Sequence, residues 1–184
     1  MKRQIEIEYR AKLSKEKHDS LHQFLCEKGE NLGKDDKNVF FFIMENKLLK
    51  VTNNISKNNA KITLKLNEIG KGAAFEEIEF PISNNDVSTA VFLFKELGFI
   101  EVQESFQKRE NFIYKDVEIA LKYSEMWKHH IELEIIISDE SQKDLADKKI
   151  KNVADELGVI IMTEEELIKF TKSKNEQYND DTNK

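Results

Sequence analysis

The sequence predicts an α+β fold in which antiparallel strands predominate and the sheet is able to close on itself. Two observations support this prediction. Charged and apolar residues alternate strictly over several short segments, as in strands with one polar face. Other segments repeat their apolar residues at helical spacing and are bounded by capping residues. Few of these helical segments connect neighbouring strands, so we expect hairpins rather than crossovers.

The first predicted strand covers residues 5–13, where every second residue from Glu6 to Lys12 is charged. Successive side chains of a strand point to opposite faces. One face therefore carries Glu6, Glu8, Arg10 and Lys12. The other face carries Ile5, Ile7, Tyr9 and Leu13 and is expected to be buried.

Similar alternation or β-branched and aromatic content predicts further strands along the chain. These strands cover residues 39–43, 47–52, 61–66, 77–80, 106–114, 117–122 and 130–135. The first two are expected to pair about a short turn at Glu45-Asn46.

Four helices fit the apolar spacing and the capping signals. They cover residues 14–28, 84–97, 141–157 and 163 to about 170. Ser14 is a suitable N-cap for the first helix, and Gly29 follows its end. The last helix opens with Thr163 and Glu166 at the spacing of a capping box.

Length and composition indicate one domain and exclude several classes of protein. The chain has 184 residues, of which 35% are charged, and a formal net charge of −6. We expect a single domain over residues 1–170 and a polar, flexible tail over residues 171–184. Cys26 is the only cysteine, which excludes an intramolecular disulfide. The chain shows no secretory h-region and no apolar run near the ~20 residues of a membrane span, so we expect a cytoplasmic protein with no membrane partner.

The polar faces of the predicted strands carry charges in a recurring pattern. Acidic pairs two residues apart occur at Glu6/Glu8, Glu77/Glu79 and Glu132/Glu134. Cations on the strands are Arg10, Lys12, Lys50, Lys65, Lys108, Arg109 and Lys122. An open sheet with one solvated face would explain mixed charges of this kind. A barrel with a charged lumen would also explain them, and it would need a divalent metal for the carboxylates and a polyanion for the cations.

The order of these charged segments resembles that of the CYTH, or triphosphate tunnel metalloenzyme, superfamily. Glu6-x-Glu8-x-Arg10 resembles the Glu-x-Glu-x-Lys signature near the start of that family. Further along, the segments that match in order are 49–52, 63–65, Glu77-x-Glu79, Lys108-Arg109 and 122–134. The resemblance extends from residue 5 to about residue 170.

The resemblance implies an eight-stranded antiparallel β-barrel that forms a tunnel with flanking α-helices. It also implies hydrolysis of a small-molecule triphosphate, which is inorganic tripolyphosphate, thiamine triphosphate or a nucleoside triphosphate, with Mg²⁺ or Mn²⁺ as cofactor. Carried over by position, the metal residues are Glu6, Glu8, Glu132 and Glu134, of which Glu8 and Glu132 are the catalytic candidates. The phosphate-binding candidates are Arg10, Lys12, Lys50, Lys65, Lys108 and Arg109. Further residues expected in the lumen are Glu77, Glu79 and Lys122.

Two departures from the family pattern leave the activity open. Thr52 stands where an arginine is expected, and Lys122 stands where an aspartate is expected. A class IV-like adenylate cyclase and a non-catalytic triphosphate-binding module therefore remain alternatives to the triphosphatase. The negative net charge argues against nucleic acid as a partner, and we expect a monomer or a homodimer.

Overall fold

The computed structural model describes residues 4–44, 47–66, 74–99, 101–171 and 173. The turn predicted at Glu45-Asn46 lies outside these residues, as does the predicted tail apart from residues 171 and 173. Of the helices in the described part of the chain, none has the length and apolar character needed to span a membrane.

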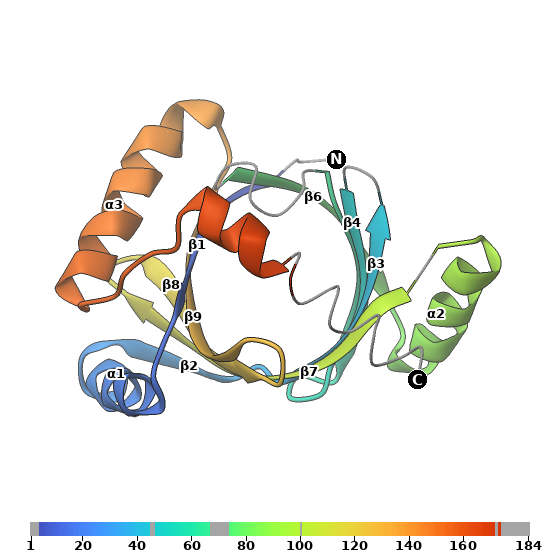
Figure 1. Cartoon of the computed structure of the whole chain (residues 1–184), viewed down its shortest axis with the longest axis horizontal. Coiled ribbons are helices and arrows are strands. Elements are labelled where there is room, and N and C mark those ends of the chain that lie inside the picture. Colours follow the sequence, from blue (N-terminus) through green and yellow to red (C-terminus); the bar gives the residue numbers. More distant parts are fainter. Residues whose placement is uncertain (1–3, 45–46, 67–73, 100, 172, 174–184) are drawn as a thin grey trace.

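Nine strands in the described residues form one antiparallel sheet that closes into a barrel. The strands are β1 (Gln4–Lys12), β2 (Glu30–Lys34), β3 (Lys37–Met44), β4 (Lys47–Asn54), β5 (Asn59–Lys65), β6 (Ala74–Ile82), β7 (Glu101–Tyr114), β8 (Val117–Ser124) and β9 (Lys128–Ile137). Neighbouring strands follow the order β7-β3-β4-β5-β6-β1-β9-β8, and β8 pairs again with β7. Figure 1 shows this ring viewed along the tunnel. The implied eight-stranded barrel is thereby confirmed.

The sequence does not predict β2, which lies outside the ring on an edge of β7. Its residues do not alternate between apolar and charged, and most of them are exposed. Backbone pairing with β7 holds the strand in place, from Glu30 opposite Ile113 to Lys34 opposite Glu110. The register shifts at Gly33, whose φ of 85° suits a glycine at such a bulge.

The hydrophobic core lies outside the barrel, between the strands and the helices. On β1, Ile7 and Ala11 are at most 1% exposed and pack in this core, whereas Glu6, Glu8 and Arg10 line the lumen. The predicted division of β1 into an apolar and a charged face is therefore seen in the structure, with the charged face turned inward.

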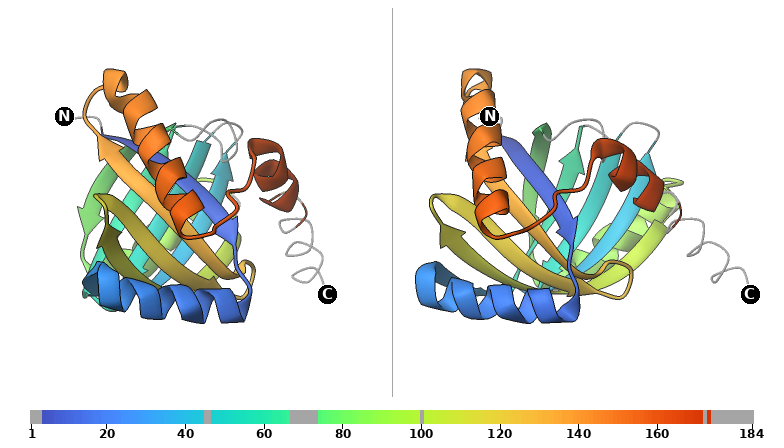
Figure 2. Two further views of the ribbon diagram at one scale, coloured as in Figure 1. Left: turned by 90° about the vertical axis from the view of Figure 1, so that its left-hand side faces the viewer. Right: turned by 60° about the vertical axis from the view of Figure 1, so that its left-hand side comes forward.

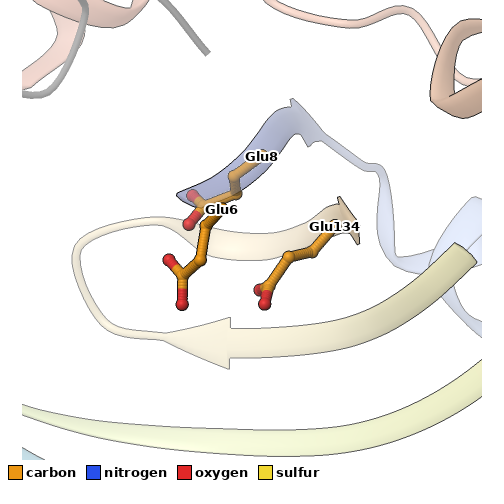
Figure 3. A group of neighbouring side chains, drawn as sticks. All are labelled: Glu6, Glu8 and Glu134. Atoms are coloured by element: carbon orange, nitrogen blue, oxygen red, sulfur yellow. The ribbon is translucent and has the colours of Figure 1, made fainter. Parts of the chain in front are cut away.

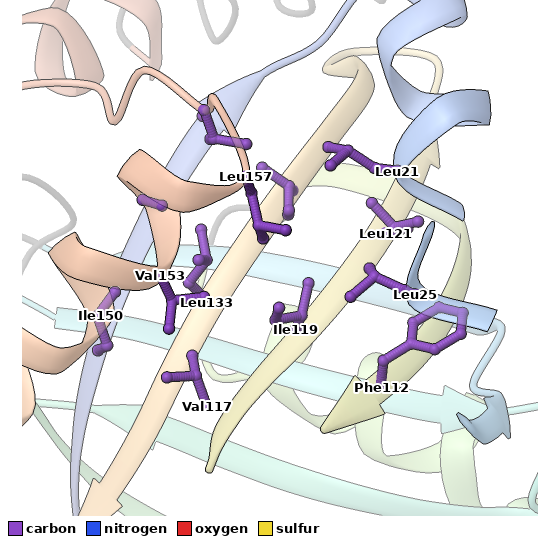
Figure 4. Packing of buried hydrophobic residues seen from close by; sticks show 14 of the residues in the cluster. Leu21, Leu25, Phe112, Val117, Ile119, Leu121, Leu133, Ile150, Val153 and Leu157 are labelled. Carbon is purple, nitrogen blue, oxygen red and sulfur yellow. The ribbon is translucent and has the colours of Figure 1, made fainter. Parts of the chain in front are cut away.

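Three helices cover the outside of the barrel (Figure 1), and those of residues 15–28 and 143–156 are seen on its near side in Figure 2. Helices α1 (Lys15–Lys28) and α3 (Lys143–Glu156) pack on β1, β7, β8 and β9 around a cluster that includes Leu25, Phe112 and Ile150 (Figure 4). Helix α2 (Val87–Glu96) packs on β4, and its residue Val91 belongs to a second cluster with Phe42. A further helix covers residues 164–171.

The predicted helix ends agree with the structure where capping side chains are present. Ser14 Oγ accepts a hydrogen bond from Lys17 N–H, and Thr163 and Glu166 form the predicted reciprocal capping box. The segments predicted to begin α2 and α3 instead start with short 3₁₀ turns, at Asn84–Asp86 and Glu140–Gln142. These turns move the α-helical starts two or three residues later than predicted.

Replacement of Ile150 by alanine should lower the free energy of unfolding by about 2–5 kcal/mol. Ile150 is 0% exposed between α3 and the barrel, so truncation leaves a cavity and loses apolar burial. Urea denaturation followed by circular dichroism would measure the effect. Leu145→Ala is the matched control, because Leu145 is 73% exposed and its truncation should change stability by less than about 0.5 kcal/mol. Equal effects of the two substitutions would contradict the described packing of α3.

Candidate functional site

The lumen of the barrel is a cavity of about 950 Å³ whose walls are densely charged. Among the described residues that line it, the cations are Arg10, Lys37, Lys50, Lys57, Lys61, Lys65, Arg109 and Lys122. The carboxylates are Glu6, Glu8, Asp35, Glu77, Glu79, Glu118, Glu132 and Glu134. The interpretation of an open sheet with one solvated face is wrong, because the strands form a closed ring and these charges point into it.

Three of the carboxylates converge on one point in the lumen. Glu6 and Glu8 come from β1, and Glu134 lies opposite Glu8 on β9. One carboxylate oxygen of each lies within 4.8 Å of the other two. Figure 3 shows the side chains of the three residues gathered in this place. We name Glu6, Glu8 and Glu134 the carboxylate trio.

The electrostatics of the carboxylate trio favour a bound divalent cation. Burial, together with the negative charges of Glu6 and Glu8, raises the pKa of Glu134 to about 8. Burial also raises the pKa of Glu6, although the nearby charge of Lys65 opposes this. A hard divalent cation would relieve the repulsion among the carboxylates, and oxygen ligands are those that Mg²⁺ and Mn²⁺ prefer. The residues present therefore fit such a cation.

Glu132 does not converge with the carboxylate trio, although the family resemblance implied one metal site for all four residues. Its carboxylate lies 2.9 Å from Arg10 Nε and 2.9 Å from Lys122 Nζ, with Arg109 Nη1 at 3.5 Å. Burial alone would raise the pKa of Glu132, but these three cations hold it well below its usual range. Within the described structure, Glu132 thus forms ion pairs with three cations and is not a member of the carboxylate trio.

Lys65 and Arg10 connect the carboxylate trio to the cations. Lys65 Nζ lies 3.3 Å from Glu6, 3.5 Å from Glu8 and 2.7 Å from Glu77. Arg10 forms ion pairs with both Glu8 and Glu132. The acidic and basic residues of the lumen are therefore interleaved, and each of these two cations contacts more than one carboxylate.

Two of the predicted phosphate-binding residues do not line the cavity. Lys108 is exposed on the outer face of β7, because its neighbour Arg109 points into the lumen and consecutive strand residues point to opposite faces. Lys12 lies beyond the lining residues of β1, where its ammonium group is 3.6 Å from the ring centre of Phe170. Of the predicted Lys108-Arg109 pair, Arg109 therefore lines the cavity and Lys108 does not.

The remaining predicted lumen residues are all brought to the cavity wall. Lys50 Nζ lies 3.9 Å from Glu77, and Glu79 is exposed and pairs with Lys61. Burial, with the positive charge of Lys65, lowers the pKa of Lys50 to about 8. Burial likewise lowers the pKa of Lys122 to about 8, although Glu132 opposes this.

Several lining residues were missed by sequence reasoning. Lys61 and Glu118 could have been found, because Lys61 lies four residues before Lys65 and Glu118 lies four residues before Lys122, on the same face of each strand. Glu118 accepts a hydrogen bond from Asn111 at 2.9 Å. Asp35 and Lys57 lie in turns, where no alternation indicates which way a side chain points.

The helix of residues 164–171 lies across one mouth of the barrel (red in Figure 1). Phe170 makes an edge contact with Trp127 at 4.5 Å between ring centres, and Thr171 lines the cavity. Trp127 also packs on His130, with ring centres 5.2 Å apart. Burial and the charge of Lys122 lower the pKa of His130 to about 3, so this histidine is neutral near pH 7.

The fold and the lumen define an α+β tunnel protein with a charged interior, and solved structures of the same shape exist. A conserved hypothetical protein from Pyrococcus furiosus is 27% identical, with a TM-score of 0.70 over 85% of this chain and 94% of that chain. A protein from Pyrococcus horikoshii is 25% identical, with a TM-score of 0.71 over 88% of this chain and 99% of its own. An adenylyl cyclase-like protein from Hippeastrum, described as having a dominant triphosphatase activity, is 15% identical, with a TM-score of 0.63 over 86% and 89% of the two chains.

A family model supplies the classification. The CYTH domain model matches residues 4–166 of the chain. The chain therefore belongs to the CYTH domain family. No curated protein sequence matches it significantly.

Proposed function

We propose that this protein is a triphosphatase that depends on Mg²⁺ or Mn²⁺ and hydrolyses a linear triphosphate bound in the barrel lumen. The observation that carries the proposal is the placement of the carboxylate trio beside a group of buried cations in one cavity. Phosphoryl transfer requires mainly positioning and neutralisation of charge. A metal site next to a cationic cage meets both requirements.

Glu6, Glu8 and Glu134 would hold the metal, because they supply converging carboxylate oxygens. The bound cation would neutralise charge on the phosphate oxygens and polarise the phosphoanhydride. Glu132, which was predicted to be a metal ligand, would have a different role. Its ion pairs with Arg10, Lys122 and Arg109 would hold these cations at one side of the substrate.

Five lumen cations would bind the phosphate groups. They are Arg10, Lys50, Lys65, Arg109 and Lys122. Their charged groups lie in a largely desolvated cavity, where interactions with phosphate oxygens are stronger than in water. Glu8 and Glu132 raise the pKa of Arg10 against the effect of burial, so the guanidinium stays charged.

The relatives support the same chemistry. The Hippeastrum protein of the same fold is described with a dominant triphosphatase activity, and other solved structures of this shape carry adenylate cyclase descriptions. Both reactions begin with a bound triphosphate, so the relatives agree on the kind of ligand.

One assay separates the three candidate activities. The purified protein is incubated with tripolyphosphate, thiamine triphosphate or ATP in the presence of Mg²⁺ or Mn²⁺, and phosphate and cyclic AMP are measured. Phosphate release that requires the metal supports the proposal. Cyclic AMP without phosphate release would identify a cyclase instead. Metal-dependent binding with neither product would identify a non-catalytic binding module.

The affinity of the metal-free protein for tripolyphosphate should fall as the pH rises through about 8. The pKa values of Lys50 and Lys122 are lowered to about 8, so both side chains carry a charge below this pH and lose it above. In Lys50→Arg part of the fall should disappear, because arginine stays charged. Calorimetric titrations at about pH 7 and about pH 9 would measure this, since these values lie on either side of the shifted pKa.

Lys61→Arg is the matched control for this pH effect. Lys61 lies at the cavity wall with its side chain 42% exposed, so the same substitution there should leave the pH dependence unchanged. If Lys50→Arg and the wild type lose affinity equally above pH 8, Lys50 does not bind the phosphate chain.

A further inference from the structure

Asp35 is a buried carboxylate in the lumen that the proposed reaction does not use. It lies in the turn between β2 and β3, and its side chain is 4% exposed. Its backbone N–H donates to Arg109 C=O at 2.8 Å, and Arg109 N–H donates to Asp36 Oδ1 at 2.9 Å. These two hydrogen bonds attach the turn to β7 and hold Asp35 at the cavity wall.

Three cations surround the carboxylate of Asp35. Lys37 Nζ lies 2.6 Å away, Lys57 Nζ 3.2 Å and Arg109 Nε 3.4 Å. Burial would raise the pKa of Asp35, but the neighbouring cations and hydrogen-bond donors lower it to about 2. Asp35 is therefore ionised throughout the physiological pH range.

Two amide groups complete the surroundings of this carboxylate. Asn54 Nδ2 donates to Asp35 at 2.6 Å, and Asn111 Nδ2 donates at 3.4 Å. Three cations and two amide N–H groups gathered around one carboxylate form the kind of donor set that binds a phosphate group. In this protein the chain's own carboxylate occupies the position of that group.

Arg109 connects this place to the proposed triphosphate cage. Its Nε lies 3.4 Å from Asp35 and donates to Asn111 Oδ1 at 2.6 Å, while its Nη1 lies 3.5 Å from Glu132, which also pairs with Arg10 and Lys122. The donors around Asp35 are therefore one guanidinium group away from the cations that would hold the substrate. Lys57, whose side chain is 47% exposed, lies on the same cavity wall.

We propose that Asp35 limits the length of the phosphate chain that the lumen accepts, because its carboxylate occupies the position that the next phosphate of a longer chain would take. This inference rests on the proposed function, since it assumes that a triphosphate binds beside Arg109. Asp35 acts as a specificity-determining residue that withholds Lys37 and Lys57 from further phosphates.

The test compares the affinities of linear tripolyphosphate and linear hexaphosphate by calorimetry. In Asp35→Asn the ratio of hexaphosphate to tripolyphosphate affinity should rise about 10–100-fold over the wild type, as expected for one new set of charge-assisted hydrogen bonds. Asp116→Asn is the matched control. Asp116 pairs with Lys149 on the outer surface, and its φ of 55° is readily adopted by asparagine.

Two further variants keep the test decisive. Adding Lys57→Gln to Asp35→Asn should remove most of the gain for hexaphosphate. Lys57→Gln alone, at a side chain that is half exposed, should leave the affinity ratio of the wild type unchanged because Asp35 already blocks that position.

The outcomes distinguish failure of this inference from failure of the proposed function. If Lys57→Gln alone lowers the affinity ratio, longer chains already reach this place and the inference is wrong, even if Asp35→Asn fails to fold. If Asp35→Asn binds tripolyphosphate with an unchanged ratio, the inference is wrong while the proposed function stands. If the wild type binds no tripolyphosphate, the proposed function fails and the inference with it.

Discussion

Glu8→Gln should lower the affinity of the protein for Mn²⁺ or Mg²⁺ at least about 100-fold and abolish metal-dependent phosphate release. Glu8 is 8% exposed, it lies opposite Glu134 in the β1–β9 register, and it contacts both Arg10 and Lys65. Glutamine retains the shape of the side chain but removes the charge and one of the two carboxylate oxygens. Binding of Mn²⁺ is measured by electron paramagnetic resonance, and phosphate release is measured on tripolyphosphate.

Glu104→Gln is the matched control for Glu8→Gln. Glu104 is exposed on β7 and accepts a hydrogen bond from Asn38, so the same chemical change is made on the outside of the barrel. It should leave metal affinity and phosphate release within about twofold of the wild type, as expected for a surface substitution. Unchanged Mn²⁺ affinity in Glu8→Gln would remove the carboxylate trio as the metal site.

Glu132→Gln should instead reduce the stability of the fold, by about 3–5 kcal/mol. The substitution leaves Lys122 beside a neutral amide in a buried environment and removes one carboxylate partner each from Arg10 and Arg109, and uncompensated buried charge is strongly destabilising. Urea denaturation of the metal-free protein measures the loss. Tripolyphosphate should restore more stability to this variant than to the wild type, because its phosphates supply the missing negative charge.

The double variant Glu132→Gln/Lys122→Met separates the loss of the ion pairs from other effects. It removes Lys122, the cation left beside the neutral amide, so its stability should lie between those of Glu132→Gln and the wild type. A stable Glu132→Gln protein that has lost its affinity for Mn²⁺ would instead assign Glu132 to the metal, as the sequence pattern suggested.

Alternation along the strands made most of the barrel predictable. A strand with one charged and one apolar face can turn its charged face either into the barrel or outward. Helices pack on the apolar faces of β1, β8 and β9 on the outside, so the charged faces point inward. The same rule could have excluded Lys108, since Arg109 next to it points to the opposite face. Strand β2 was not predictable in this way, because backbone pairing with β7 determines it and its side chains are mostly exposed.

Which charged residues of the lumen lie beside one another could not be predicted from the sequence. Glu132 and Glu134 share one face of β9, yet Glu132 lies among three cations and Glu134 lies beside Glu6 and Glu8. The difference depends on which residues the neighbouring strands place opposite them, which are Arg10 for Glu132 and Glu8 for Glu134. Registers between strands distant in sequence are set by the whole barrel. Asp35 was missed because a turn carries no alternation.

The shared contacts of Lys65 and Arg10 have a thermodynamic consequence. Each cation can neutralise either a carboxylate of the carboxylate trio or a phosphate. When it contacts one of these groups, its electrostatic interaction with the other is weaker. A metal bound to the carboxylate trio would neutralise its carboxylates, so that Lys65 and Arg10 could pair with the phosphate chain. A bound phosphate chain would likewise draw these cations from the trio, so that its carboxylates could bind the metal. The two ligands should therefore bind with positive cooperativity, each raising the affinity for the other by the same factor.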